Sequence, residues 1–99
     1  MKCIPLKIVP LVVDGQEGKF DYKAQIAAIL RTPSNPQIGA DYDEIRKSIR
    51  ILDILEAAEG EIKLEDADHE YLQGRVMGAR FVVIAHAVEA FIEDVIDPK

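Results

Sequence analysis

The stretch of sequence that most suggests chemistry is GEIKLEDADHEYL, residues 60–72, which holds five carboxylates and one histidine. Such side chains can bind a metal ion or exchange protons, or they can simply start a helix. Asp66, Asp68 and Glu70 have the spacing of the first three ligands of a calcium loop, but the glycine and the later glutamate that such a loop requires are replaced by tyrosine and methionine. The pattern therefore favours helix initiation, with Asp66 as the N-cap.

A second candidate for metal chemistry is the set His86, Glu89 and Glu93, which share one face of an expected helix. Di-iron bundle proteins use Glu-x-x-His motifs from paired helices, whereas here the order is reversed and the motif occurs once. A homodimer would supply a second set, so a metal site between subunits stands beside the simpler interpretation of a solvated polar face. Within one chain, we predict no metal and no other cofactor.

Nucleophilic catalysis finds no support in the residue pattern. The single cysteine, Cys3, lies in an apolar stretch, where a cysteine usually serves as a small buried hydrophobic residue. No serine lies in a recognisable nucleophile turn, and DGQEG at residues 14–18 lacks the lysine of a phosphate-binding loop. We therefore expect a protein that is not an enzyme.

Arg46, Lys47 and Arg50 form a small basic patch on an expected helix. Three cations at this spacing can hold phosphates, but more often they pair with acidic neighbours such as Asp43 and Asp53. The net charge of −6 opposes nonspecific attraction to nucleic acids and anionic membranes. The charge balance disfavours a nucleic-acid partner and leaves basic proteins open as partners.

The acidic side chains are concentrated in residues 53–70, which carry eight acidic groups and one basic group. A surface bearing Glu61, Asp66 and Asp68 would suit an inhibitor that imitates nucleic acid and occupies the basic groove of a host or phage protein. Such binding should fall steeply with salt concentration. Because helix initiation already accounts for part of this charge, the inhibitor is the alternative hypothesis.

The strands and helices expected from the sequence pattern, which must position these residues, indicate one α+β domain that spans residues 1–99. Alternating apolar residues at 4–13 and 20–22, on either side of DGQEG, indicate an N-terminal β-hairpin. Two prolines make the first segment an edge strand or two short pieces. A short third strand at residues 62–64 is expected to add to the hairpin, and the sheet is expected to pack on three to four helices.

Helical periodicity predicts four helices, at residues 23–31, 42–59, 67–77 and 81–96. Asp21 or a neighbour starts the first helix. Asp41 caps the second, and Gly60 suits the left-handed position just past its end. The apolar stripe of this second helix covers nearly half its circumference, so we expect it to be covered on two sides.

The last of these helices carries a large apolar face beside a stripe of small residues: Ala79, Val83, Ala87 and Ala90. Small side chains permit close approach between helices. The stripe predicts either internal packing or a subunit interface, and a chain of this size gains much from burying surface in a homo-oligomer.

The combination IRKSIRILDILEAAEGEIKLEDADHEYL, followed by RV and AFIEDV within residues 45–95, resembles small proteins encoded in the structural gene clusters of tailed phages and prophages. In these, a hairpin with a DG turn precedes a helix, a central helix ends in LEAAE, and an xLEDxDxxxL segment leads to a hydrophobic last helix. Glu65 departs from the Ser or Thr expected before the third helix. The resemblance carries no catalytic residues, and it implies a role in virion assembly or attachment to other phage proteins.

The predicted function is therefore a non-enzymatic protein–protein interaction module that self-associates and binds a phage or host protein. No apolar run approaches the ~20 residues that a membrane span needs, so no membrane partner is expected. Prolines interrupt the apolar N-terminal stretch, which does not read as a signal peptide. We expect the protein in the host cytoplasm and also in the virion.

Overall fold

The computed structural model describes residues 1–81 and 83–98. Within them the chain forms, in order, β1 (Lys2–Pro5), β2 (Ile8–Val13), β3 (Gln16–Asp21), α1 (Tyr22–Arg31), α2 (Tyr42–Ala57), β4 (Glu61–Leu64), α3 (Asp66–Gly78) and α4 (His86–Ile96). The α+β class, with an N-terminal hairpin, a further strand and four helices, is confirmed. None of the described helices is long and apolar enough to cross a membrane.

The strands form two separate antiparallel pairs. β2 and β3 make the expected hairpin, with a two-residue turn at Asp14 and Gly15, both at positive φ as a type I′ turn requires. β1 pairs instead with β4, so that Lys2 lies opposite Leu64. The prediction that residues 62–64 extend the hairpin is therefore wrong, because the N-terminal segment divides into two strands and only the first reaches β4.

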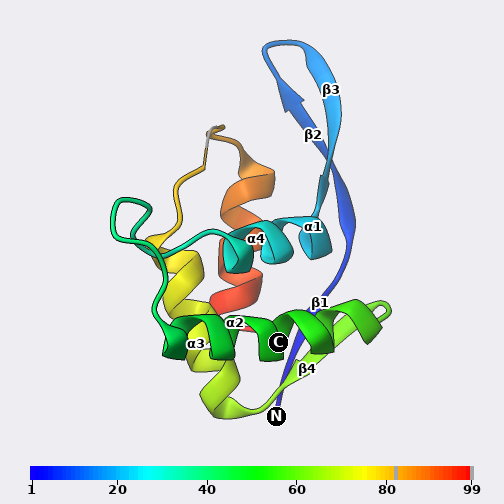
Figure 1. Ribbon diagram of the computed structural model, residues 1–99. Coiled ribbons are helices and arrows are strands. Elements are labelled where there is room, and N and C mark those ends of the chain that lie inside the picture. The colour runs from blue at the N-terminus through cyan, green and yellow to red at the C-terminus, as the bar shows by residue number, and fades with distance from the viewer. Residues whose placement is uncertain (82, 99) are drawn as a thin grey trace.

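The core lies between the β1–β4 sheet and the helices, and it also contains the base of the hairpin. At its centre the Phe91 ring meets the rings of Tyr22 at 5.0 Å and Phe20 at 5.4 Å, both edge to face. The other buried apolar residues are Ile4, Ile26, Leu30, Ile51, Leu55, Ile62, Leu64, Leu72, Val76, Val88 and Val95. In Figure 1 the outer part of the hairpin projects away from the helices that enclose this core.

The first two helices begin as expected. The Asp21 carboxylate accepts hydrogen bonds from the backbone N–H groups of Lys23 and Ala24. The Asp41 carboxylate accepts one from the N–H of Glu44 at 2.8 Å. Gly60 has φ +76°, the left-handed conformation expected for it, but α2 ends at Ala57 with Ala58 as its C-cap, so the helix stops before Gly60 and not at it.

The other two helices differ from expectation at their N-termini. α3 has Glu65 rather than Asp66 as its N-cap, and no side chain caps it. Asp66 is instead the first helical residue, where its charge still suits the positive end of the helix dipole. α4 begins at His86 and not at residue 81. The β-branched side chains of Val83 and Ile84 disfavour an earlier start, since such side chains lose rotamer freedom in a helix.

Candidate functional site

The most exposed element is the β2–β3 hairpin, here called the arm (residues 8–21). Its β2 strand alternates between the exposed residues Ile8, Pro10 and Val12 and the half-buried Val9, Leu11 and Val13. Val9 and Leu11 pack against the core, as does Phe20 from β3. One face of the arm therefore rests on the body at its base, and the other presents apolar side chains to solvent.

The base of the arm is fastened to α4 through one carboxylate. The Tyr22 hydroxyl donates to Asp94 Oδ2 at 2.8 Å, and Lys7 Nζ lies 3.4 Å from the same oxygen. The Tyr22 backbone N–H also donates to the Lys7 carbonyl at 3.0 Å. Burial of the hydroxyl and its contact with Asp94 raise the pKa of Tyr22 well above its usual range. Tyr22 therefore remains a neutral donor at this junction.

A second exposed surface is the α2 stripe, which we define as Tyr42, Ile45 and Ile49. These side chains are 79%, 45% and 51% exposed, and they follow one another at helical spacing. A shallow hollow of about 190 Å³ beside them is lined in part by Leu30, Pro33 and Leu52. The prediction that α2 is covered on two sides is wrong. Its packing partners among the described elements, α1, α3 and β4, cover only the side that carries Ile51 and Leu55.

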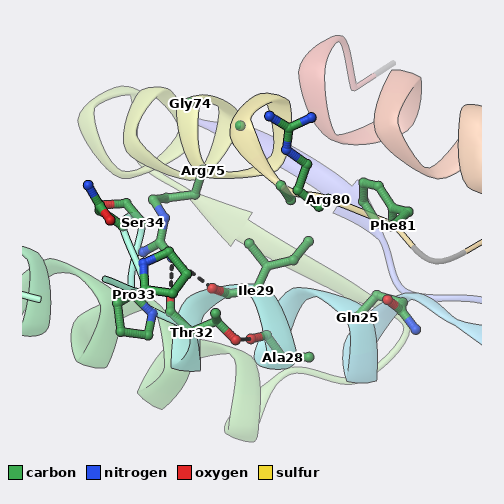
Figure 2. A pocket seen from close by; sticks show the side chains of 14 residues that line it. Gln25, Ala28, Ile29, Thr32, Pro33, Ser34, Gly74, Arg75, Arg80 and Phe81 are labelled. Carbon is green, nitrogen blue, oxygen red and sulfur yellow. Dashed lines mark hydrogen bonds between the residues drawn. The ribbon is translucent and has the colours of Figure 1, made fainter. Parts of the chain in front are cut away.

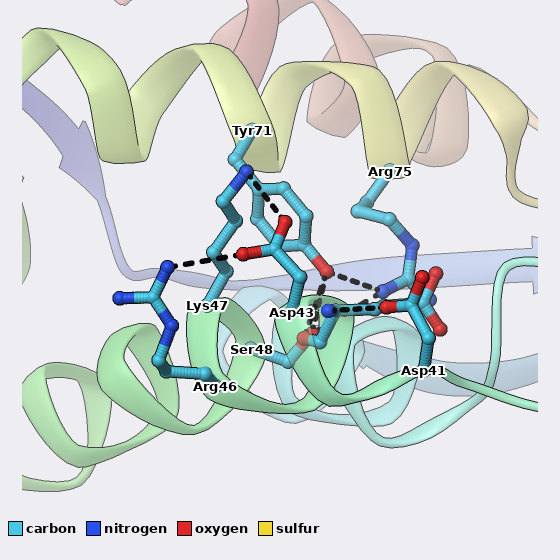
Figure 3. Close-up of polar contacts among 8 residues, drawn as sticks. Asp41, Asp43, Arg46, Lys47, Ser48, Tyr71 and Arg75 are labelled. Atoms are coloured by element: carbon cyan, nitrogen blue, oxygen red, sulfur yellow. Dashed lines mark hydrogen bonds and ion pairs between the residues drawn. The ribbon is translucent and has the colours of Figure 1, made fainter.

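Figure 3 shows Arg46 and Lys47 of the basic patch paired with an α2 carboxylate. Arg46 and Lys47 each approach Asp43 to 3.0 Å. Arg50 Nε donates to Asp68 of α3 at 3.0 Å, which joins the two helices. The two neighbouring cations hold the pKa of Asp43 below its usual value. The cations of the patch are therefore paired with carboxylates of the same chain, and a phosphate that binds here would have to displace these carboxylates.

The acidic residues expected to face a basic partner are likewise paired. Glu61 lies 3.9 Å from Lys63, and Asp66 lies 3.9 Å from the N-terminal ammonium group. Asp68, bound to Arg50, has a side chain only 15% exposed. These three carboxylates therefore do not make an uninterrupted acidic surface.

The stripe of small residues does not run along one helix. Ala79 is the C-cap of α3, Val83 lies in the connecting segment, and only Ala87 and Ala90 belong to α4. The prediction of a single small-residue face is therefore wrong, and its cause is the later start of α4. A subunit interface that includes these residues stays a prediction.

His86, Glu89 and Glu93 are all exposed on α4. Within residues 1–81 and 83–98, no three or more metal-ligating side chains of the single chain come close enough to hold an ion. The metal site between two subunits stays a prediction, since it needs a second copy of α4.

Arg75 has a role that sequence reasoning missed. Figure 2 shows it beside a pocket of about 560 Å³ between the end of α1 and the end of α3. Its guanidinium donates to the carbonyl oxygens of Ile29, at 2.9 Å, and Thr32. It also donates to the Tyr71 hydroxyl at 3.1 Å. Arg75 therefore adds a donor to two carbonyls at the C-terminus of α1, where the Ile29 carbonyl also accepts the backbone N–H of Thr32 at 3.3 Å.

His69 is the other residue whose role was missed. It is buried, and its Nε2 lies 2.7 Å from the Val95 carbonyl oxygen, which joins α3 to α4. The spacing of His69 with Leu72 and Val76, at i, i+3 and i+7, is the signal that could have placed it on the inner face. The histidine of the acidic stretch is thus a packing residue in the core.

Comparison with protein families, curated proteins and solved structures gives no significant match to this chain. The assignment of function therefore depends on its own surfaces. Two of them carry exposed apolar side chains in a regular arrangement: the arm and the α2 stripe. Both arrangements are suited to contact with another polypeptide.

Proposed function

We propose that the chain is a non-enzymatic protein–protein interaction module that self-associates and also binds a second protein. The observation that carries the proposal is the α2 stripe, where Tyr42, Ile45 and Ile49 lie exposed in line on one helix face. Single exposed apolar residues are ordinary, but aligned ones that border a hollow are typical of interaction sites.

The partner that fits the α2 stripe is a protein that presents an amphipathic helix. The stripe repeats at i, i+3 and i+7, the spacing with which two helices interdigitate, and the hollow beside it adds further apolar contact. Asp43, Arg46 and Lys47 on the same helix supply charges of both signs, as the rim of an interface usually does. The resemblance to phage proteins supports a partner from virion assembly, encoded by phage or host.

The test combines affinity capture of the partner with sedimentation of the purified chain. Ile45→Glu together with Ile49→Glu should weaken partner binding at least about tenfold, because two charges enter an apolar contact. Ile84→Glu is the matched control, since Ile84 is fully exposed in the segment before α4 and lies outside the stripe. It should leave binding unchanged.

Two outcomes would contradict the proposal. A chain that stays strictly monomeric at high micromolar concentration and captures no partner has neither of the proposed interactions. Binding that falls steeply with salt and is abolished by Glu61→Lys with Asp66→Lys would favour the acidic inhibitor. Binding that changes neither with salt concentration nor with these charge reversals would exclude the inhibitor hypothesis.

A further inference from the structure

The turn of the arm determines which backbone groups point outward. Val13 and Gln16 flank a two-residue turn, so their backbone N–H and C=O groups point toward each other and form two hydrogen bonds. From there, the backbone groups of successive residues point alternately toward the partner strand and away from it. The residues of β3 whose backbone N–H and C=O groups point away from β2 are Glu17, Lys19 and Asp21. The corresponding residues of β2 are Ile8, Pro10 and Val12.

The two edges of the arm are not equivalent. Pro10 has no N–H, so β2 lacks the middle donor of its outer edge, a feature typical of edges that do not accept another strand. β3 keeps its outward donors, and Glu17, Gly18 and Lys19 are all exposed. In the part of the chain that the structure describes, no third strand pairs with β3. β3 is therefore the open edge.

Pairing with a further strand would stabilise the arm. An isolated two-stranded sheet is marginally stable in water, and three or more strands with an apolar face are needed for independent stability. Ile8 and Val12 are 60% and 61% exposed on one face of the arm. The outer part of the arm stands clear of the helices, so an incoming strand has room beside it (Figure 1).

We infer that the strand which adds to β3 is β3 of a second copy of this chain, antiparallel about a two-fold axis at Gly18. The inference rests on the self-association proposed above and specifies its interface. In this register Glu17 lies opposite Lys19 of the second copy, and their outward backbone groups form four hydrogen bonds across the axis. Gly18 lies opposite Gly18 of the second copy in a non-hydrogen-bonded pair, where the two Cα atoms approach to about 4.5 Å. Glycine has no side chain, so this close approach causes no steric clash.

Charge selects this register over its neighbours. An axis at Lys19 would set lysine against lysine and Glu17 against Asp21, and an axis at Glu17 would set glutamate against glutamate. An axis nearer the body would bring the second copy against α1, which begins at Tyr22. Lysine on a strand edge usually disfavours pairing with another strand. Here Lys19 lies opposite Glu17 of the second copy in the proposed register, so the lysine disfavours only the registers that place like charges opposite each other.

The experiment measures the dimer dissociation constant of the full chain by sedimentation over low to high micromolar concentrations. Glu17→Lys and Lys19→Glu should each raise the Kd roughly tenfold to a hundredfold, because two opposite-charge pairs become like-charge pairs. The two single variants carry complementary charges, so their equimolar mixture should form a heterodimer. The double variant, which swaps the two charges, should dimerise like the unaltered chain.

The matched control is Lys63→Glu in β4, because Lys63 lies two residues from Glu61 as Lys19 lies two residues from Glu17. It should leave the Kd unchanged, and far-UV circular dichroism should show that all variants are folded. Single variants that dimerise normally, or a mixture that stays monomeric, would overturn the inference while self-association itself stands. An unaltered chain that is monomeric at high micromolar concentration would overturn both the β3 interface and self-association. The binding of a second protein through the α2 stripe would still be decided by the capture experiment with Ile45→Glu and Ile49→Glu.

Discussion

The β1–β4 sheet and the arm are both antiparallel pairs of short strands, yet one lies in the core and the other projects from it. Ile4, Ile62 and Leu64 of the first have no exposed surface, whereas Ile8 and Val12 of the second are more than half exposed. The first is packed by α2, α3 and α4, while the arm meets helices only near its base. The comparison teaches that the helices covering a strand, and not its hydrogen-bond ladder, determine what the strand adds to stability.

The largest effect should come from the same substitution made once in each sheet. Ile4→Ala should lower the free energy of unfolding by about 2–5 kcal/mol, because it leaves a cavity in the core. Ile8→Ala removes the same atoms from an exposed position and should cost under about 1 kcal/mol. Urea denaturation of both variants measures the difference, and equal losses would show that the arm belongs to the same packed unit as β1–β4.

The junction between the two regions should show the next largest effect. Tyr22→Phe removes the hydrogen bond to Asp94 and should cost about 1.5–3 kcal/mol, as bonds to charged groups do. The raised pKa of Tyr22 adds a dependence on pH. Its folded form resists ionisation while the unfolded chain ionises near its ordinary value of 10.0, so its stabilising contribution is complete below that pH and is lost above it.

Unfolding free energies at about pH 9 and about pH 11 test this second prediction. The unaltered protein should lose more stability over that interval than Tyr22→Phe, because the variant lacks the titrating group. The difference between the two proteins cancels the titration of the other tyrosines and of the lysines. Parallel declines would mean that the junction does not hold Tyr22 in its neutral form.

Two glycines give the smallest and most direct test of the comparison. Gly15 and Gly60 have φ of +79° and +76°, and an added Cβ would meet no atom within 4 Å at either position. Alanine should therefore introduce the same local strain, about 1 kcal/mol, at both sites. Gly60→Ala should lower global stability, whereas Gly15→Ala should mainly speed amide hydrogen exchange in the arm. Equal global losses would indicate that the arm unfolds together with the body.

The features predicted correctly from the sequence are those that depend on close neighbours along the chain. One or two residues determine each of them: the turn at Asp14 and Gly15, the caps Asp21 and Asp41, and the left-handed backbone at Gly60. The pairing of β1 with β4 could not be predicted in the same way. A four-residue strand carries little information about its partner, and helix packing decided between two available edges.

The surfaces divide in a similar way. The pairing of Asp43 with Lys47 was expected from their i,i+4 spacing and is confirmed. The exposure of Ile45 and Ile49 was not expected, because apolar residues at helical spacing usually indicate a buried face. The contact of Arg75 with Ile29 was also missed, since it depends on how closely α3 approaches the end of α1.

The register of β1 with β4 also has a consequence for synthesis on the ribosome. The partner of Lys2 is Leu64, so roughly sixty residues must emerge after β1 before the pair can close. At ordinary elongation rates this takes ~3–12 s, during which the arm, with its two-residue turn, has ample time to form. Of the four strands β1 is therefore synthesised first, yet it can pair only after β4, the strand synthesised last, has emerged.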